Sequence, residues 1–168
     1  MKMGLVSILL AAPLLAQVSA AQTDPFTPLR FLVGEWRGVG AGQPGQAQGK
    51  ADFGFELDGK VLVRRNRTEL AASDGRPSAS HEDLMTIFAE GGQVKALYLD
   101  NEGHVIRYVV AARPDGVVFT SEPASGPRFR LSYTKKNEIL VTVRFEIAPP
   151  GKSEAFSTYL EADTRKTK

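Results

Sequence analysis

The segment Phe31-Leu32-Val33-Gly34-Glu35-Trp36-Arg37-Gly38-Val39-Gly40 contains the only tryptophan of the chain, set among alternating glycines. In an extended strand, residues two apart lie on the same face, so Gly34 and Gly38 share a face with Trp36. Glycines on that face leave room for the indole ring where other backbone passes close. The segment therefore predicts a strand whose tryptophan plugs one end of a closed sheet.

This strand is the first of ten strand-like segments, which are separated by turns rich in glycine, asparagine, aspartate and proline. They are predicted at 35–39, 48–57, 60–70, 80–90, 93–99, 104–111, 117–122, 127–135, 138–148 and 154–162. Short connections and the absence of a second helical region indicate an all-β, antiparallel up-and-down barrel of about ten strands. The alternative is a two-sheet sandwich. Before the first strand, Asp24 and Pro25 predict the start of a short helix.

The first 20 residues have the pattern of a secretory leader. Lys2 precedes a short apolar run, and Val18-Ser19-Ala20 supplies the small residues of a cleavage site. The run is shorter than the about 20 apolar residues that span a bilayer, so we expect no stable membrane anchor. The sequence thus predicts a signal peptide at 1–20, one barrel domain at 21–168, and an exported protein, periplasmic or secreted.

Composition restricts the partners and the means of stabilisation. The chain has no cysteine, so core burial must stabilise the fold without disulfides. Without Lys2, the 21 basic residues become 20 against 19 acidic ones, and no long basic block occurs. Nucleic-acid binding is therefore not expected.

The hairpin at Asp58-Gly59 has two possible registers. A two-residue turn places Phe53 and Phe55 on the same face as Leu62, Arg64 and Asn66. A three-residue loop places them with Val61, Val63, Arg65 and Arg67 instead, which puts more apolar residues inside. We favour the second register. By the same reasoning, a three-residue loop at 135–137 joins the apolar faces of the flanking strands.

On the favoured register, several polar side chains gather on the inner wall. Arg67 lies opposite Asp83, Arg65 lies opposite Met85, and His81 lies on the same side. His104 or Tyr108 from a later strand completes the cluster. Buried charges must be paired or bound to a ligand, so the cluster indicates either a binding cavity or a structural ion pair near the barrel mouth.

Other kinds of chemistry have weaker support in the sequence. His81 and Asp83 point the same way, but with two histidines and no cysteine we predict no metal site. No G-x-S-x-G motif or Ser-His-acid set occurs, so we assign no catalytic residue.

The motif Gly34-Glu35-Trp36-Arg37-Gly38-Val39-Gly40 resembles the opening G-x-W-x-G-x-G of nitrobindin-like barrels, within the broader calycin group. An uncharacterised bacterial exported family of the same shape is similar in the later pieces Leu57-Asp58-Gly59-Lys60, Asn101-Glu102-Gly103 and Gly126-Pro127-Arg128-Phe129-Arg130-Leu131. The resemblance implies an antiparallel barrel with an apolar pocket. Nitrobindins hold haem through a histidine near the chain's end, and the matching segment 153–162 has none. We therefore predict no cofactor, with haem through Tyr159 as the alternative.

Together these features favour a non-enzymatic barrel that binds a small, mostly apolar or amphipathic molecule. We expect Arg65 or Arg67 to anchor an acidic head group. The residues predicted to line the ligand are Trp36, Phe53, Phe55, Arg65, Arg67, Met85, Ile106, Tyr108, Phe129, Tyr133, Val143 and Phe145. Two alternatives stay open: an enzyme that uses the polar cluster on a lipid-like or pigment-like substrate, and a filled barrel that acts as an envelope interaction module.

Overall fold

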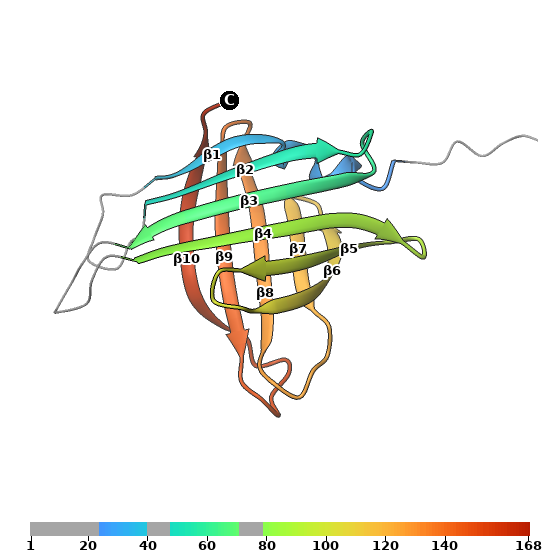
Figure 1. Ribbon diagram of the computed structural model, residues 1–168, viewed down its shortest axis with the longest axis vertical. Coiled ribbons are helices and arrows are strands. Elements are labelled where there is room, and N and C mark those ends of the chain that lie inside the picture. The colour runs from blue at the N-terminus through green and yellow to red at the C-terminus, as the bar shows by residue number, and fades with distance from the viewer. Residues whose placement is uncertain (1–23, 40–47, 71–78) are drawn as a thin grey trace, which may run out of the picture.

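Ten strands form one closed antiparallel barrel in the computed structural model, which describes residues 24–39, 48–70 and 79–168. In Figure 1, β1 to β4 cross the front of the barrel and β8 to β10 pass behind them. The strands are β1 (Gly34–Val39), β2 (Gln48–Glu56), β3 (Val61–Leu70), β4 (Ala79–Glu90), β5 (Gln93–Asp100), β6 (Val105–Arg113), β7 (Gly116–Ser121), β8 (Arg128–Asn137), β9 (Leu140–Ala148) and β10 (Ser157–Lys166). The predicted barrel is confirmed, and the sandwich is excluded because all ten strands belong to one closed sheet.

Each strand pairs with the next one along the chain, and β10 returns to pair with β1. At the closure, the amide of Glu35 donates to the carbonyl of Lys168 at 3.1 Å. The backbone passes so close here that a Cβ on Gly34 would lie 2.2 Å from the Lys168 carbonyl oxygen, and Gly34 has a φ of +123°. A glycine is required at the head of the tryptophan motif because the barrel closes against it.

The segment before β1 is a 3-10 helix, η1 (Thr27–Leu32). It begins slightly later than the predicted helix, after a turn in which Asp24 accepts a hydrogen bond from the amide of Phe26 at 3.0 Å. Leu29 and Leu32 are each 1% exposed and join the barrel core. The indole Nε1 of Trp36 donates to the carbonyl of Leu32 at 2.7 Å. Trp36 and η1 therefore plug one end of the barrel together, where the β6–β7 and β8–β9 hairpins turn; we call this the closed end. No helix among the described residues is long and apolar enough to cross a membrane.

The register of the β2–β3 hairpin differs from the one that the sequence favoured. Phe53 pairs with Arg64 and Phe55 with Leu62, across a turn of four residues, 57–60. Three consecutive turn residues, Leu57, Asp58 and Gly59, have positive φ angles. Because four residues have the same parity as two, the inward face carries Leu62, Arg64 and Asn66. The predicted three-residue loop is wrong. It was chosen because it placed more apolar residues inside, but a buried arginine can be neutralised by a carboxylate on another strand.

The same shift changes the pairing of β3 with β4. Asp83 lies opposite Asn66, and Arg67 lies opposite Glu82 on the outer face. The predicted pairs Arg67–Asp83 and Arg65–Met85 are therefore wrong by one residue. At the β8–β9 hairpin the loop itself differs, since the register shifts between Lys135 and Asn137 and the turn is at 138–139. The apolar faces of β8 and β9 meet as predicted, because Leu131 pairs with Phe145.

Candidate functional site in the barrel lumen

Aromatic side chains fill the half of the lumen next to the closed end. The ring of Tyr133 makes edge-to-face contacts with Phe53 at 5.6 Å and with Phe119 at 5.9 Å between centroids. Tyr108 meets Phe119 in the same way at 6.3 Å. All four rings are at most 5% exposed. Such pairs stabilise a core beyond the area they bury, so this half of the barrel is packed rather than hollow.

A buried ion pair lies next to these aromatic rings, on the side away from the closed end. The Nη2 atom of Arg64 is 2.9 Å from both carboxylate oxygens of Asp83. Nη1 of Arg64 donates to the hydroxyl of Tyr133 at 3.0 Å, and the amide of Asn66 donates to Asp83 Oδ2 at 2.8 Å. Nε of Arg64 and Oδ1 of Asp83 have no hydrogen-bond partner in the protein. The pair is thus charge-balanced but incompletely hydrogen-bonded, which is a costly arrangement in a barrel interior.

A second polar network lies farther from the closed end, on β4 to β6. The carboxylate of Asp100 accepts four hydrogen bonds, from the amides of Glu102 and His104, from the hydroxyl of Tyr98 and from Nδ1 of His104. Burial acts to raise the pKa of Asp100, but the bonds from His104, Tyr98 and Glu102 outweigh it and hold the pKa below its usual value. Burial and the nearby carboxylates of Asp83 and Asp100 raise the pKa of Tyr98, so its hydroxyl stays protonated.

His81 connects this network to the rim of the barrel. Its Nε2 atom lies 3.1 Å from the Tyr98 hydroxyl, and its Nδ1 atom lies 3.0 Å from the Glu102 carboxylate. Since Tyr98 gives its only proton to Asp100, it can only accept from Nε2. A carboxylate also only accepts. Both contacts are therefore hydrogen bonds at once only when His81 is protonated on both nitrogens and positively charged.

The opposite wall of this half is apolar. The rings of Phe129 and Phe145 stack with centroids 5.9 Å apart, and the ring of Tyr159 meets Phe145 edge-on at 6.1 Å. The pairing of β9 and β10 shifts between Thr158 and Leu160, so Tyr159 is the extra residue of a bulge. Tyr159 is 74% exposed and the neighbouring Leu160 is 46% exposed. This wall thus ends in an apolar lip open to water.

Most of the residues predicted to line a ligand do face the lumen. Trp36, Phe53, Met85, Tyr108 and Tyr133 belong to the buried core. A second group packs against that core and is partly exposed, and it contains Phe55, Ile106, Phe129, Val143 and Phe145. His81 and Asp83 share the inward face, as expected.

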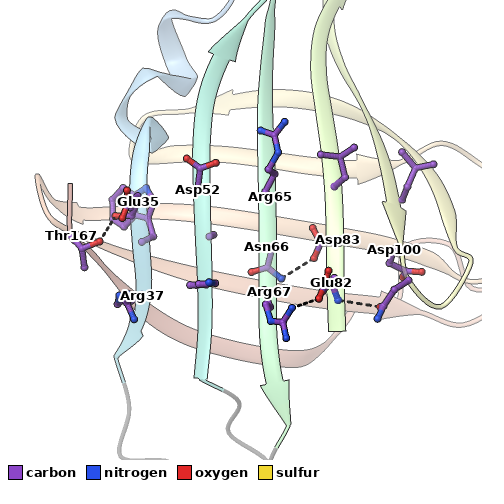
Figure 2. Close-up of a pocket in the computed structure, with 16 residues that line it drawn as sticks. Glu35, Arg37, Asp52, Arg65, Asn66, Arg67, Glu82, Asp83, Asp100 and Thr167 are labelled. Carbon is purple, nitrogen blue, oxygen red and sulfur yellow. Dashed lines mark hydrogen bonds and ion pairs between the residues drawn. The ribbon is translucent and has the colours of Figure 1, made fainter. Parts of the chain in front are cut away.

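The prediction that Arg65 or Arg67 anchors a ligand is wrong, because both side chains face outward. The side chain of Arg65 is 57% exposed and pairs with Glu56. The side chain of Arg67 is 46% exposed and pairs with Glu69 and Glu82. Both arginines line a concavity of about 720 Å³. Figure 2 shows them among the residues around it. Its lining comes from β1 to β5 and the segments that follow β5 and β10, with no residue of β6 to β9, so it is a groove on the outer face and not the lumen.

Sequence reasoning missed Arg64, Asn66, Tyr98 and Asp100 as lumen residues. The signal for the first two was present in the register that was set aside, in which Leu62, Arg64 and Asn66 alternate on the face of Phe53. Tyr98 and Asp100 alternate in the same way with Ala96 along β5. Among the described residues, no three His, Asp or Glu side chains are grouped to hold a metal ion. The predicted leader at 1–20 lies outside the described residues.

Comparisons with known proteins give no family. A scan against protein-family models finds no match. A search of the curated proteins also finds none. The closed ten-stranded antiparallel barrel is consistent with a calycin-like shape, and the specific resemblance to nitrobindin-like proteins stays a prediction.

The four hydrogen bonds to Asp100 predict a pH-dependent contribution to stability. Because the folded pKa of Asp100 is lowered, its contribution is fully present above the unfolded pKa of about 3.9 and is lost as pH falls through the lower folded value. We expect Asp100→Asn to lower the free energy of unfolding at pH 7, with a smaller difference from the unsubstituted protein at pH 3. Urea denaturation at both pH values measures it, and a difference that does not shrink at pH 3 would contradict the expectation.

Proposed function

We propose that the barrel binds a small amphipathic molecule in the half of the lumen away from the closed end. The observation that supports this proposal is partial exposure of inward-facing side chains. In a closed barrel, a side chain that points inward can meet water only through space inside the barrel. His81, Tyr98, Phe129 and Phe145 all point inward and are all partly exposed. Their exposure supports a solvent-accessible space in the open half of the lumen.

The two walls of this space differ in chemistry, which supports an amphipathic ligand rather than a purely apolar one. One wall, on β3 to β6, carries the hydrogen-bonded groups of Asn66, His81, Tyr98 and Asp100. The other wall carries the stacked rings of Phe129 and Phe145. Ligand sites commonly combine apolar surface with a few well-placed polar groups.

The packed rings next to the closed end limit the size of the ligand. Phe53, Phe119 and Tyr133 are at most 5% exposed, and Tyr133 contacts both of the other rings across the lumen. A ligand that enters from the open end would stop at the Arg64–Asp83 pair above these rings. The proposed site is therefore a cup, formed by the open half of the lumen, that takes a short molecule. The leader-like segment at 1–20 supports export of the protein to the periplasm or outside the cell.

A pair of alanine substitutions tests the proposal. Ala162 lies opposite Val143 on the inward face and is partly exposed, so Ala162→Phe would fill the lumen. Ala111 lies on the outer face of β6 and is exposed, so Ala111→Phe is the matched control. We expect titration with 1-octanol, followed by NMR, to shift resonances of lumen residues in the unsubstituted protein and in Ala111→Phe but not in Ala162→Phe.

Two outcomes would contradict lumen binding. The first is a lack of any saturable shift in the unsubstituted protein, which would favour the filled-barrel alternative. The second is equal binding by both variants, which would place the octanol on the outside. Circular dichroism of each variant checks that the barrel is intact before the titrations are compared.

A further inference from the structure

We propose that the head group held in the lumen is an organic ammonium, and that the lumen selects against carboxylates. This inference rests on the proposed function and names its ligand class. It starts from the charges that face the open half of the lumen. Asp83 and Asp100 point into it from β4 and β5, and Glu102 stands at its rim. Arg64 is the only arginine or lysine that faces this half among the described residues.

The Nη atoms of Arg64 are already engaged within the protein, and only its buried Nε has no hydrogen-bond partner. Its Nη2 atom contacts both oxygens of Asp83, and its Nη1 atom donates to Tyr133. A bidentate bond from this guanidinium to a second carboxylate would require breaking those contacts and leaving Asp83 buried without its partner, which is strongly unfavourable. After Arg64 and Asp83 cancel, the carboxylates of Asp100 and Glu102 remain, and their charge is uncompensated when His81 and His104 beside them are neutral.

In the part of the chain that the structure describes, Lys135 and Lys166 also face inward, but both lie away from this space. Lys135 pairs with Glu138 at the β8–β9 turn. The ammonium of Lys166 lies 5.3 Å from the centroid of the Trp36 ring, at the plugged end of the barrel. Neither compensates the acidic surplus of the open half, so a carboxylate ligand would meet like charge there and an ammonium would meet opposite charge.

The register explains why the sequence predicted the opposite ligand charge. The favoured register placed Arg65 and Arg67 inside, which would have made the lumen basic and suited to an acidic head group. In the structure both arginines are exposed on the outer face and pair with Glu56, Glu69 and Glu82. A shift of one residue moves two cations out of the lumen and brings in one arginine that is already neutralised.

His81 supports the inference in a second way. Its ring occupies the acidic side of the cup, with Glu102 at 3.0 Å, Asp83 at 3.6 Å and the Tyr98 hydroxyl at 3.1 Å. Both of its hydrogen bonds form together only in the positively charged state. A neutral imidazole therefore leaves one of these acceptors without a donor, which the N–H of a bound ammonium would supply. His104 contacts Asp100 and lies 4.0 Å from Glu102 in the same group.

The aromatic wall suits an ammonium as well as an apolar tail. The rings of Phe129 and Phe145 lie on the apolar wall, stacked face to face with centroids 5.9 Å apart. An organic cation near an aromatic face is attracted to the ring by about 0.5–1 kcal/mol at exposed sites. A carboxylate gains nothing comparable from these rings. The acidic side and the aromatic side therefore favour the same class of head group.

Three probes with the same eight-carbon tail test this inference: octylammonium, 1-octanol and octanoate. Calorimetric titration at pH 8 keeps the amine protonated and the acid ionised. We expect octylammonium to bind at least about tenfold more tightly than octanoate. Glu102→Gln should weaken octylammonium several-fold and leave 1-octanol unchanged, whereas Glu138→Gln, at the other end of the barrel, should change neither.

The outcomes separate this inference from the proposed function. If none of the three probes binds, the proposed lumen site is wrong and the inference is wrong with it. If 1-octanol binds but octanoate binds as tightly as octylammonium or more tightly, the lumen site stands and the ammonium preference is wrong. An equal loss of octylammonium affinity in Glu102→Gln and Glu138→Gln would also overturn the preference, because it would reflect the net charge of the protein and not the cup.

Discussion

Replacing Arg64 with methionine is expected to lower the free energy of unfolding by about 3–5 kcal/mol, because the substitution leaves the carboxylate of Asp83 buried without its counter-charge. The side chains of Arg64 and Asp83 are only 8% and 2% exposed, so the carboxylate is largely shielded from water. Urea denaturation at pH 7, followed by circular dichroism, measures the loss.

The neighbouring arginine provides the matched control. Arg65 is 57% exposed and pairs with Glu56 on the surface, so Arg65→Met should cost less than about 1 kcal/mol. The double variant Arg64→Met with Asp83→Leu removes both buried charges and should recover most of the stability lost in the single variant. Similar losses in Arg64→Met and Arg65→Met would contradict the register of β3 as well as the ion pair.

Replacing Trp36 with alanine is expected to cost about 3–5 kcal/mol, as is usual for removal of a large buried aromatic side chain. The ring is 3% exposed, belongs to the core and joins β1 to η1 through its bond to Leu32. Thermal unfolding followed by circular dichroism is the measurement, since the substitution removes the only tryptophan fluorophore.

Trp36→Phe separates the ring from its hydrogen bond. Phenylalanine keeps an aromatic plug but loses the indole donor, so the Leu32 carbonyl loses its partner and the cost should be closer to about 1–3 kcal/mol. If Trp36→Phe were as damaging as Trp36→Ala, the hydrogen bond to η1 and not the buried ring would be the main contribution of this residue.

The strands and their order could be predicted from the sequence because both depend on local signals. Alternation of apolar residues marks each strand, and residues such as Gly91 and Gly92 mark the turns. All ten predicted segments became strands, with ends that differ by a few residues. The Trp36 motif also predicted the location of the plug, because Gly34 beside it marks the close backbone contact with Lys168.

The lumen site could be predicted only in part, because its chemistry depends on register. The four-residue turn at 57–60 contains Leu57 and Asp58 with positive φ, a conformation that residue preferences do not favour. Arg64 was also placed on the outer face, because the β3 sequence by itself does not show that Asp83 on β4 neutralises its charge. Long-range pairing of charges decides such a case, and no local pattern contains that information.

The junction between β1 and β10 has a consequence for how the protein is made. β1 pairs with β10, which follows it by more than a hundred residues of chain. Residues 166–168 complete this pairing through backbone contacts with Glu35 and Trp36. During synthesis, β1 must therefore leave the ribosome long before β10 exists, with one row of backbone amides and carbonyls unpaired. Nascent chains that stop before Ser157 would expose two unpaired strand edges, on β1 and on β9. Such edges pair readily with other chains, so these chains would be the species most in need of a chaperone.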